Sequence, residues 1–317
     1  MNKIEEHYNS LTWRQKLAFN ILWVLCCIVR FMPRWFRFGV IRPFLSWIFR
    51  LIGYRRDVIL RNLANAFPEK SELERQNIMR RYYITLAEVF VNTISLVNAT
   101  PKRDGKALIC SGAKEHIEKN KNRDWIAMAS HFGCWEFFPM WGWIDTDCEF
   151  LSVYHPLKNS VFEHFYLRIR SFAPNIVPVT MAESLRYYIK NRNRGHNMVL
   201  GLISDQSPVL KADTEWIDFL NQPTAFIDGS EKLALRFGIP VYFIDIERRA
   251  ADSYHLNFIE IYDGEESVAP NEITRRYAEK LESMIRKSPE LWLWSHKRWK
   301  HTSAKQARLF KNKSNNK

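Results

Sequence analysis

WIAMASHFGCWE, residues 125–136, joins the pattern of a buried strand to a group of reactive side chains. The apolar run over 125–130 predicts a short strand that is covered on both faces. Open α/β sheets bind their ligands beyond the carboxyl ends of the strands, and that is where this strand delivers His131. Gly133 then permits a tight turn. We therefore expect His131 at the edge of a parallel sheet, followed by a helix whose first turns carry Glu136.

Similar apolar runs recur further along the chain, separated by amphipathic stretches. They predict buried strands near 149–153, 176–179, 198–204 and 239–246, and an edge strand near 255–261. The patterns between and before them predict helices near 71–97, 159–172, 183–193, 229–237 and 271–287. Strands that alternate with helices indicate an α/β fold with a largely parallel central sheet flanked by helices.

The N-terminal residues predict attachment to a membrane. Residues 17–29, LAFNILWVLCCIV, form an apolar run between Lys16 and Arg30. This run is shorter than the roughly 20 residues needed to cross a bilayer core, unless Arg30 extends to the interface and the helix continues. A second apolar stretch, 38–52, follows, and tryptophans lie along both, as at a membrane interface. We expect a tilted membrane-anchoring helix and an interfacial helix, with a buried core helix as the alternative for the first run.

The positive charge of the chain is concentrated at its two ends. Of 47 Lys and Arg residues, ten lie in residues 1–60 beside three acidic residues, and eight lie in residues 296–317 beside none. The residues between them nearly balance, with 29 basic and 31 acidic side chains. A nucleic-acid-binding domain usually carries its charge on the folded body, so we expect no nucleic-acid partner. Basic ends beside apolar segments suit an anionic membrane surface and place the folded body on its cytoplasmic side.

These patterns divide the chain into three parts. We expect a membrane anchor and interfacial helix over residues 1–56, a catalytic domain over 57–302, and a basic, disordered tail over 303–317. The five cysteines are odd in number and lack the spacing of a disulfide framework, which indicates a reducing compartment.

The spacing of His131 and Glu136 predicts general-base chemistry. If His131 precedes the helix and Glu136 lies in its first turns, the carboxylate can accept a hydrogen bond from one imidazole nitrogen. The other nitrogen can then take a proton from an alcohol, a step that typically contributes about 10²–10⁴-fold to a rate. The alternative is a core histidine that is bonded to a nearby acid.

Other chemistries have weaker support. Cys134 could act as a nucleophile with His131, but no clear third partner is present. A zinc site made of His131, Cys134, Cys148 and His155 lacks standard ligand spacing. No nucleophile elbow, phosphate-binding loop or dinucleotide-binding motif is present. We expect no cofactor and no metal.

Four further blocks accompany the H-x4-E motif of residues 131–136. They are RNLANAFPE at 61–69, YHPLKN at 154–159, DQ at 205–206 and PELWLWSHKRWK at 289–300. In this order the five blocks resemble the lipid A late acyltransferases, the lauroyl and myristoyl transferases of Gram-negative envelopes. Two departures from the pattern are His155, where the family usually has arginine, and residues 219–224, which only loosely resemble its F-F-G block.

The resemblance implies a glycerolipid-acyltransferase-like fold and an enzyme of the inner membrane. Its members move a fatty acyl group from a carrier thioester, acyl carrier protein or coenzyme A, to a hydroxyl of a lipid A precursor. It implies that His131 is the general base and that Glu136 orients it. An arginine and an aspartate on which the family depends correspond to Arg168 and Asp205. For Arg168, a surface ion pair with a nearby glutamate, Glu163 or Glu183, is the alternative.

The remaining site predictions concern substrate contacts. We expect Arg170 and Lys158 to bind substrate, and the backbone N–H groups of Gly133 and Cys134 to bind the oxyanion. The C-terminal group His296, Lys297, Arg298 and Lys300 lies among tryptophans, and we expect it to contact membrane lipid or the acidic acyl carrier protein. A solvated amphipathic end is the alternative for this group. The same chemistry on another envelope lipid or a phospholipid, and a catalytically silent membrane scaffold, remain as alternative functions.

Overall fold

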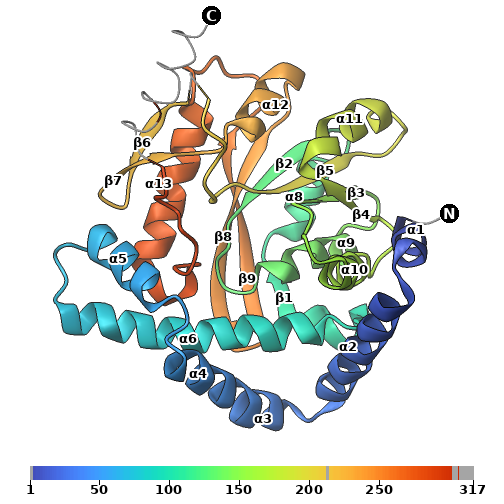
Figure 1. Ribbon diagram of the computed structural model, residues 1–317. Coiled ribbons are helices and arrows are strands. Elements are labelled where there is room, and N and C mark those ends of the chain that lie inside the picture. Colours follow the sequence, from blue (N-terminus) through green and yellow to red (C-terminus); the bar gives the residue numbers. More distant parts are fainter. Residues whose placement is uncertain (1–2, 212–213, 302–305, 307–317) are drawn as a thin grey trace, which may run out of the picture.

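The computed structural model of the chain describes residues 3–211, 214–301 and 306, and its centre is a twisted sheet (Figure 1). In the described residues this sheet has seven strands in the order β1-β9-β8-β2-β5-β3-β4. The strands are β1 (Leu108–Cys110), β2 (Trp125–Ala129), β3 (Glu149–Tyr154), β4 (Ile176–Thr180), β5 (Met198–Ile203), β8 (Val241–Ala250) and β9 (Ser253–Tyr262). Neighbouring strands run parallel except β8 and β9. The predicted α/β fold with a largely parallel sheet is confirmed.

The register of two central strands determines where the site forms. β2 and β5 pair in parallel, and Ala129 lies opposite Ile203 at the last residue of each strand. Every residue of β2 is at most 1% exposed, because helices and strands cover both of its faces. The chain therefore leaves the sheet at neighbouring points, and His131 and Asp205 each follow two residues later.

The strand predictions were wrong in two places. β9 is not an edge strand, because it lies between β1 and β8. The edges are β4 and, beside β9, β1, whose three residues are too few to show a period in the sequence. A separate antiparallel hairpin, β6 (Trp216–Phe219) and β7 (Gln222–Ala225), was not predicted either.

Helices surround the sheet and begin close to the predicted positions. The α-helices are α1 (Lys3–Ser10), α2 (Trp13–Phe31), α3 (Arg34–Phe36), α4 (Arg42–Leu51), α5 (Arg56–Ala66), α6 (Glu72–Ser95), α7 (Pro101–Asp104), α8 (Ala113–Lys119), α9 (Trp141–Ile144), α10 (Ser160–Ile169), α11 (Met181–Asn191), α12 (Gly229–Phe237) and α13 (Glu272–Lys287). Short π or 3₁₀ segments are η1 (Arg37–Ile41), η2 (Gly105–Ala107), η3 (Trp135–Met140) and η4 (Pro289–Leu291). α6 starts at a capping box in which Ser71 and Glu74 exchange hydrogen bonds, as the sequence predicts.

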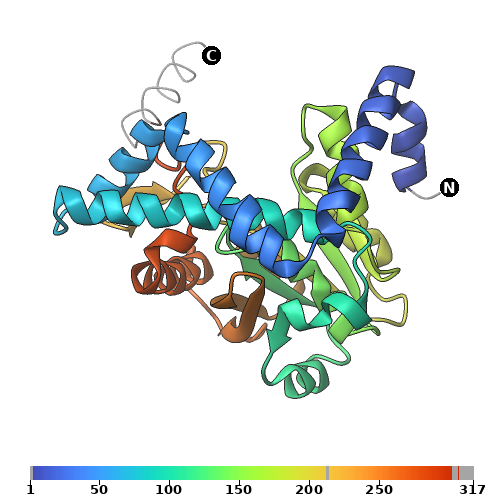
Figure 2. The same cartoon turned by 90° about the horizontal axis from the view of Figure 1, so that it is seen from below.

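α6 crosses one end of the sheet and connects the body to the N-terminal helices (Figures 1 and 2). Glu88 of α6 is 1% exposed and pairs with Arg42 of α4 (2.8 Å) and Arg248 of β8 (2.7 Å). Removal of one partner from such a buried group typically costs about 3–5 kcal/mol. This three-residue group therefore fixes α4 against the body. The predicted tail, residues 303–317, lies outside the described residues apart from residue 306.

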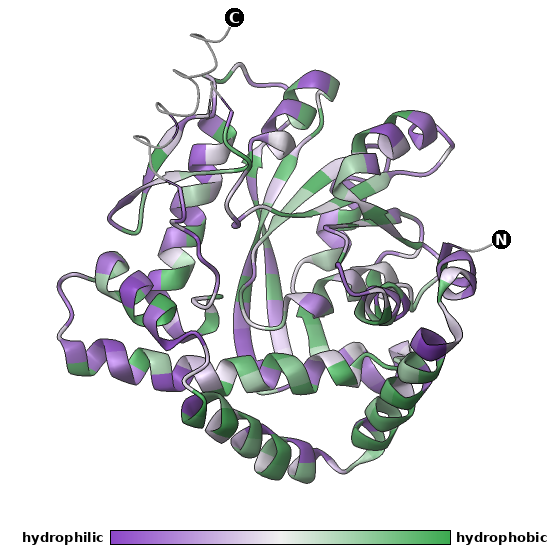
Figure 3. Cartoon of the chain, in the orientation of Figure 1, coloured by the Kyte–Doolittle hydropathy of each residue, from purple (hydrophilic) through white to green (hydrophobic). Residues whose placement is uncertain are grey.

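The N-terminal helices are rich in apolar residues (Figure 3), and many of these residues are exposed. More than half of each of the following side chains is exposed: Trp13, Leu17, Ile21, Val24, Leu25, Ile28 and Phe31 on α2, and Phe44, Trp47 and Leu51 on α4. In the described residues no single helix is long and apolar enough to cross a bilayer. The bent pair Trp13–Phe31 and Arg34–Leu51, at an angle of 109°, meets that test only when taken together. The opposite face of α2 packs on the body, where Phe19 and Cys26 are buried.

Candidate active site

The imidazole of His131 is held by Asp205. His131 Nδ1 lies 2.6 Å from Asp205 Oδ1, and the His131 backbone N–H donates to Asp205 Oδ2 at 2.9 Å. Trp292 Nε1 donates to the same Oδ2 at 2.9 Å. Asp205 is 3% exposed, so these donors replace the water that an aspartate normally binds. Asp205 thus holds both the backbone and the ring of His131.

The arrangement determines which ring nitrogen carries the proton. Burial alone would raise the pKa of the Asp205 carboxyl, but the charge of His131 and the hydrogen bonds from His131 and Trp292 hold that pKa below its usual value. A carboxylate only accepts hydrogen bonds, so in the neutral form of the ring the proton of His131 lies on Nδ1 and Nε2 is the acceptor nitrogen. Gln206 Nε2 lies 3.1 Å from His131 Nε2 and can donate to that nitrogen. This neutral tautomer is the one that a general base acting through Nε2 would need.

Glu136 does not occupy the position predicted for it. Its carboxylate accepts two hydrogen bonds from Arg170, Nε to Oε2 at 2.8 Å and Nη2 to Oε1 at 2.5 Å. Trp135 Nε1 also donates to Glu136 Oε1 at 3.2 Å, and the Trp135 ring stands edge-on to the His131 ring at 5.0 Å between centroids. The expected hydrogen bond from His131 is made to Asp205 instead. Because η3 begins only at Trp135, Glu136 points toward Arg170 at the end of α10 and reaches the imidazole only through Trp135.

Gly133 makes the predicted turn but is not a free oxyanion donor. Its φ is +55°, and a Cβ there would overlap the Tyr254 ring, so only glycine fits. The Gly133 N–H donates to the Leu291 carbonyl at 2.9 Å, which corrects the prediction that it binds an oxyanion. Cys134 is 3% exposed, and burial raises the pKa of its thiol well above the ordinary value, which argues against a nucleophilic role.

The predicted substrate contacts Arg168 and Lys158 lie apart from His131. The Arg168 guanidinium stacks on Trp23 of α2, with its carbon 4.1 Å from the ring centroid. It therefore fixes α2 to α10 and makes neither of the ion pairs considered from the sequence. Lys158 is exposed in the loop before α10. Of the three basic residues predicted to bind substrate, only Arg170 contacts a residue of the H-x4-E motif.

The C-terminal basic group is divided by burial. Lys297 and Lys300 are exposed, whereas Arg298 is 3% exposed, donates to the Ala225 carbonyl at 2.7 Å and stacks on Phe226. Burial lowers the pKa of Arg298 to about 10. The prediction that Arg298 contacts lipid or carrier is therefore wrong, because its side chain is enclosed in the body. His296 is half-buried, and burial lowers its pKa to about 4.

Two features of the site were not predicted from the residues. The tryptophan-rich segment 291–294 closes over the site, because Phe132 and Trp292 form an isolated antiparallel bridge. Gln206 lies against the base, although the sequence marks it only as part of a block. Within the described residues, no group of three or more His, Cys, Asp or Glu side chains is arranged to hold a metal ion.

Comparison with known families identifies the family of the chain. A family model described as bacterial lipid A biosynthesis acyltransferase matches residues 7–301, which include the N-terminal helices, the sheet and the closing tryptophan segment. The chain belongs to this family. The resemblance inferred from the five sequence blocks is thereby confirmed. A comparison with curated proteins gave no match. The family is one of membrane-associated acyltransferases that act in lipid A synthesis.

Proposed function

We propose that this protein transfers a fatty acyl group from a carrier thioester to a hydroxyl of a lipid A precursor, with His131 as the general base. The observation that carries this proposal is the contact of His131 with Asp205, which leaves Nε2 of the ring with a lone pair. The family supports acyl transfer to a lipid, while the donor, the acceptor and the roles of the residues are our inference.

The reaction follows from this geometry. His131 Nε2 takes the proton of the acceptor hydroxyl as its oxygen attacks the thioester carbonyl, and Asp205 stabilises the imidazolium that forms. The tetrahedral intermediate then expels the thiolate of the carrier, which takes the proton back from His131. In the reaction the acceptor hydroxyl takes the place of the Gln206 amide at Nε2, and we assign that displaced amide as the side-chain donor to the oxyanion, since the N–H of Gly133 is engaged.

We assign Glu136 a positioning role. It forms a bidentate ion pair with Arg170 in which the two side chains are 5% and 19% exposed. The pair fixes the Trp135 side chain against the ring of His131, because Trp135 donates to Glu136 and stands edge-on to that ring. Through this contact the H-x4-E motif still acts as one unit, although its histidine and glutamate are not bonded to each other.

Membrane attachment through the N-terminal helices is part of the proposal. The exposed apolar faces of α2 and α4 suit helices that lie in the bilayer interface rather than a single span. The basic residues around them favour the cytoplasmic side of the inner membrane, where an acyl carrier protein is available.

The carrier contact that we propose uses exposed lysines. Lys297, Lys300 and Arg61 line a groove of about 410 Å³ between α5, β7 and the C-terminal segment. Acyl carrier proteins are acidic, so the charge of this groove favours their approach.

The test is acyl transfer by the purified protein in detergent. Acyl carrier protein and coenzyme A thioesters are offered with a lipid A precursor and with other envelope lipids and phospholipids, and products are identified by mass spectrometry. We expect the mass of the glycolipid to rise by one acyl group, and His131→Ala and Glu136→Ala each to abolish the product. Transfer by His131→Ala within about threefold of the wild type would exclude a general base, whose contribution is about 10²–10⁴-fold. If only the phospholipids gave a product, the acceptor would be a phospholipid rather than a lipid A precursor. If no acceptor gave a product, the protein would be a catalytically silent membrane scaffold.

A further inference from the structure

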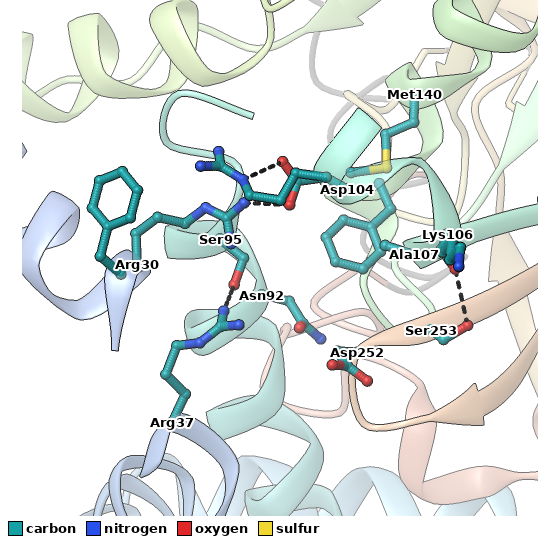
Figure 4. A pocket seen from close by; sticks show the side chains of 13 residues that line it. Arg30, Arg37, Asn92, Ser95, Asp104, Lys106, Ala107, Met140, Asp252 and Ser253 are labelled. Atoms are coloured by element: carbon teal, nitrogen blue, oxygen red, sulfur yellow. Dashed lines mark hydrogen bonds and ion pairs between the residues drawn. The ribbon is translucent and has the colours of Figure 1, made fainter. Parts of the chain in front are cut away.

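A basic pocket lies between the N-terminal helices and the body (Figure 4). It has a volume of about 480 Å³ and is formed by the elbow from α2 to η1, the end of α6, the segment from α7 to η2 and the start of β9. Two apolar residues of its wall, Phe137 and Met140, belong to η3. None of its lining residues is among those placed in acyl transfer.

Cations predominate in this pocket. The basic residues that line it are Arg30, Arg37, Arg103 and Lys106, and the acidic ones are Asp104 and Asp252. Both acids are already paired, because Asp104 binds Arg30 and Arg103, and Asp252 binds Arg34 from outside the pocket at 2.6 Å. Arg37 donates to the hydroxyl of Ser95 rather than to an acid. The pocket therefore keeps a positive charge that its own carboxylates do not balance.

Buried polar atoms of the pocket lack partners. Arg30 is 7% exposed, and its Nε has no hydrogen-bond partner among the described residues. The Nε of Arg37 is in the same situation. Asn92 is 0% exposed; its amide nitrogen donates to the Ala251 carbonyl at 2.8 Å, while its Oδ1 accepts nothing within the described part of the chain. A buried donor or acceptor without a partner destabilises the protein, so a ligand that completes these bonds is favoured.

We propose that this pocket binds the headgroup of an anionic phospholipid. The phosphate lies against Arg30 and Arg37, because guanidinium groups match phosphate oxygens in geometry and charge. A hydroxyl of the headgroup donates to Asn92 Oδ1. This lipid is distinct from the acyl acceptor, so the inference does not depend on the reaction at His131.

A lipid, rather than a soluble phosphate, is favoured by the surroundings of the pocket. Phe31 lines it and is 68% exposed, and Trp35 and Ile28 on the same elbow are 69% and 52% exposed. The acyl chains of a bound lipid would cover these side chains, whereas a free phosphate would leave them in water. The pocket would thus orient the body against the membrane through one bound lipid.

The experiment measures binding of the full-length protein to two kinds of phosphatidylcholine vesicle. One contains phosphatidylglycerol, and the other contains the same fraction of phosphatidylmethanol, which has the same charge but no headgroup hydroxyl. We expect the wild type to prefer phosphatidylglycerol, because only that headgroup offers a hydroxyl to Asn92 Oδ1. Arg37→Gln should weaken binding to both kinds of vesicle about tenfold, as loss of a charge-assisted hydrogen bond to the shared phosphate would. Lys106→Gln should reduce phosphatidylglycerol binding as well, and this side chain is exposed, so its replacement leaves the fold intact.

The matched control is Arg14→Gln. Arg14 is exposed on α2 and stacks on Trp13 outside the pocket, so its loss removes the same charge without touching the site. It should weaken binding to both kinds of vesicle much less than Arg37→Gln does, and it should leave the preference unchanged. The proposal is overturned if the wild type shows no preference, or if Arg37→Gln behaves like Arg14→Gln. It is also overturned if inorganic phosphate displaces the protein from vesicles as effectively as glycerol 3-phosphate does, which would assign the pocket to a soluble anion.

Discussion

Replacement of Asp205 by asparagine tests the assignment of the tautomer. In the wild type, Asp205 Oδ2 accepts from the backbone N–H of His131 and from Trp292, while Oδ1 accepts from His131 Nδ1. Asparagine has one carbonyl oxygen and one NH₂ group for these three donors. The oxygen is expected to stay where two donors meet, which places the NH₂ against Nδ1. The imidazole must then accept at Nδ1 and carry its proton on Nε2, where it cannot act as a base.

The size of the effect follows from the loss of general-base catalysis. We expect kcat of Asp205→Asn to fall by about 10²–10⁴-fold with little change in KM, since the acceptor contacts are retained. Single-turnover transfer from a radiolabelled acyl thioester in detergent micelles measures the chemical step directly. Trp292→Phe is the matched control, because it removes one donor to Asp205 but leaves the carboxylate and the tautomer in place.

An active Asp205→Asn enzyme would overturn this assignment of the tautomer. If Asp205→Asn retains activity within about threefold of the wild type while Glu136→Gln loses it, the imidazole is oriented in solution by Glu136. That result would restore the pairing predicted from the sequence. Thermal unfolding of both variants must show folded protein, because Asp205 and Glu136 are both buried.

Three other substitutions probe separate parts of the account. Gln206→Leu should lower kcat about 10²–10³-fold in steady-state assays, the usual cost of a lost oxyanion donor, and an unchanged kcat would remove Gln206 from the mechanism. Glu136→Gln should lower the free energy of unfolding by about 3 kcal/mol, because Arg170 loses its charged partner. It should not move the midpoint of the pH–rate profile, whereas loss of a direct hydrogen-bond partner of His131 would move it. Burial lowers the pKa of His116 to about 4. As the pH falls, this residue therefore binds a proton at a higher pH in the unfolded chain than in the folded one. The contribution of His116 to the free energy of unfolding should be complete above pH 6.5 and fall by up to about 3 kcal/mol toward pH 4. In denaturant titrations at several pH values, His116→Phe should flatten the dependence of that free energy on pH. An unaltered dependence would show that His116 contributes nothing to it.

The sequence predicts the order of strands and helices well because each buried strand is a continuous apolar run between polar stretches. It predicts the position of His131 for the same reason, since the run over 125–130 ends there. What it does not contain is the neighbour of each strand. β2 and β5 are adjacent in the sheet, although 68 residues lie between the end of β2 and the start of β5. Those residues form β3, β4 and the helices around them. The pairing of His131 with Asp205 depends on that adjacency.

A signal for the correct partner was nevertheless present. Asp205 follows its strand at the same interval at which His131 follows β2, and two parallel neighbours in register bring such residues together. The sequence pattern favours Glu136 because it is close to His131 along the chain, but the 3₁₀ geometry of η3 turns its side chain toward Arg170. Arg168 and Arg170 are two positions apart at the end of α10. Arg168 therefore stacks on Trp23 of α2, whereas Arg170 pairs with Glu136 at the site. That choice depends on helix packing, which spacing alone does not reveal.

The tautomer of His131 is the most direct measure of the central claim. Two-bond ¹H–¹⁵N correlation spectra of protein labelled at the imidazole nitrogens distinguish protonated from unprotonated ring nitrogen, and the His131→Gln spectrum identifies the signal among the nine histidines. Recorded at a pH where the ring is neutral, the spectrum should show a proton on Nδ1 and none on Nε2. A proton on Nε2 would contradict the account, because the nitrogen that faces the acceptor hydroxyl could not then remove its proton.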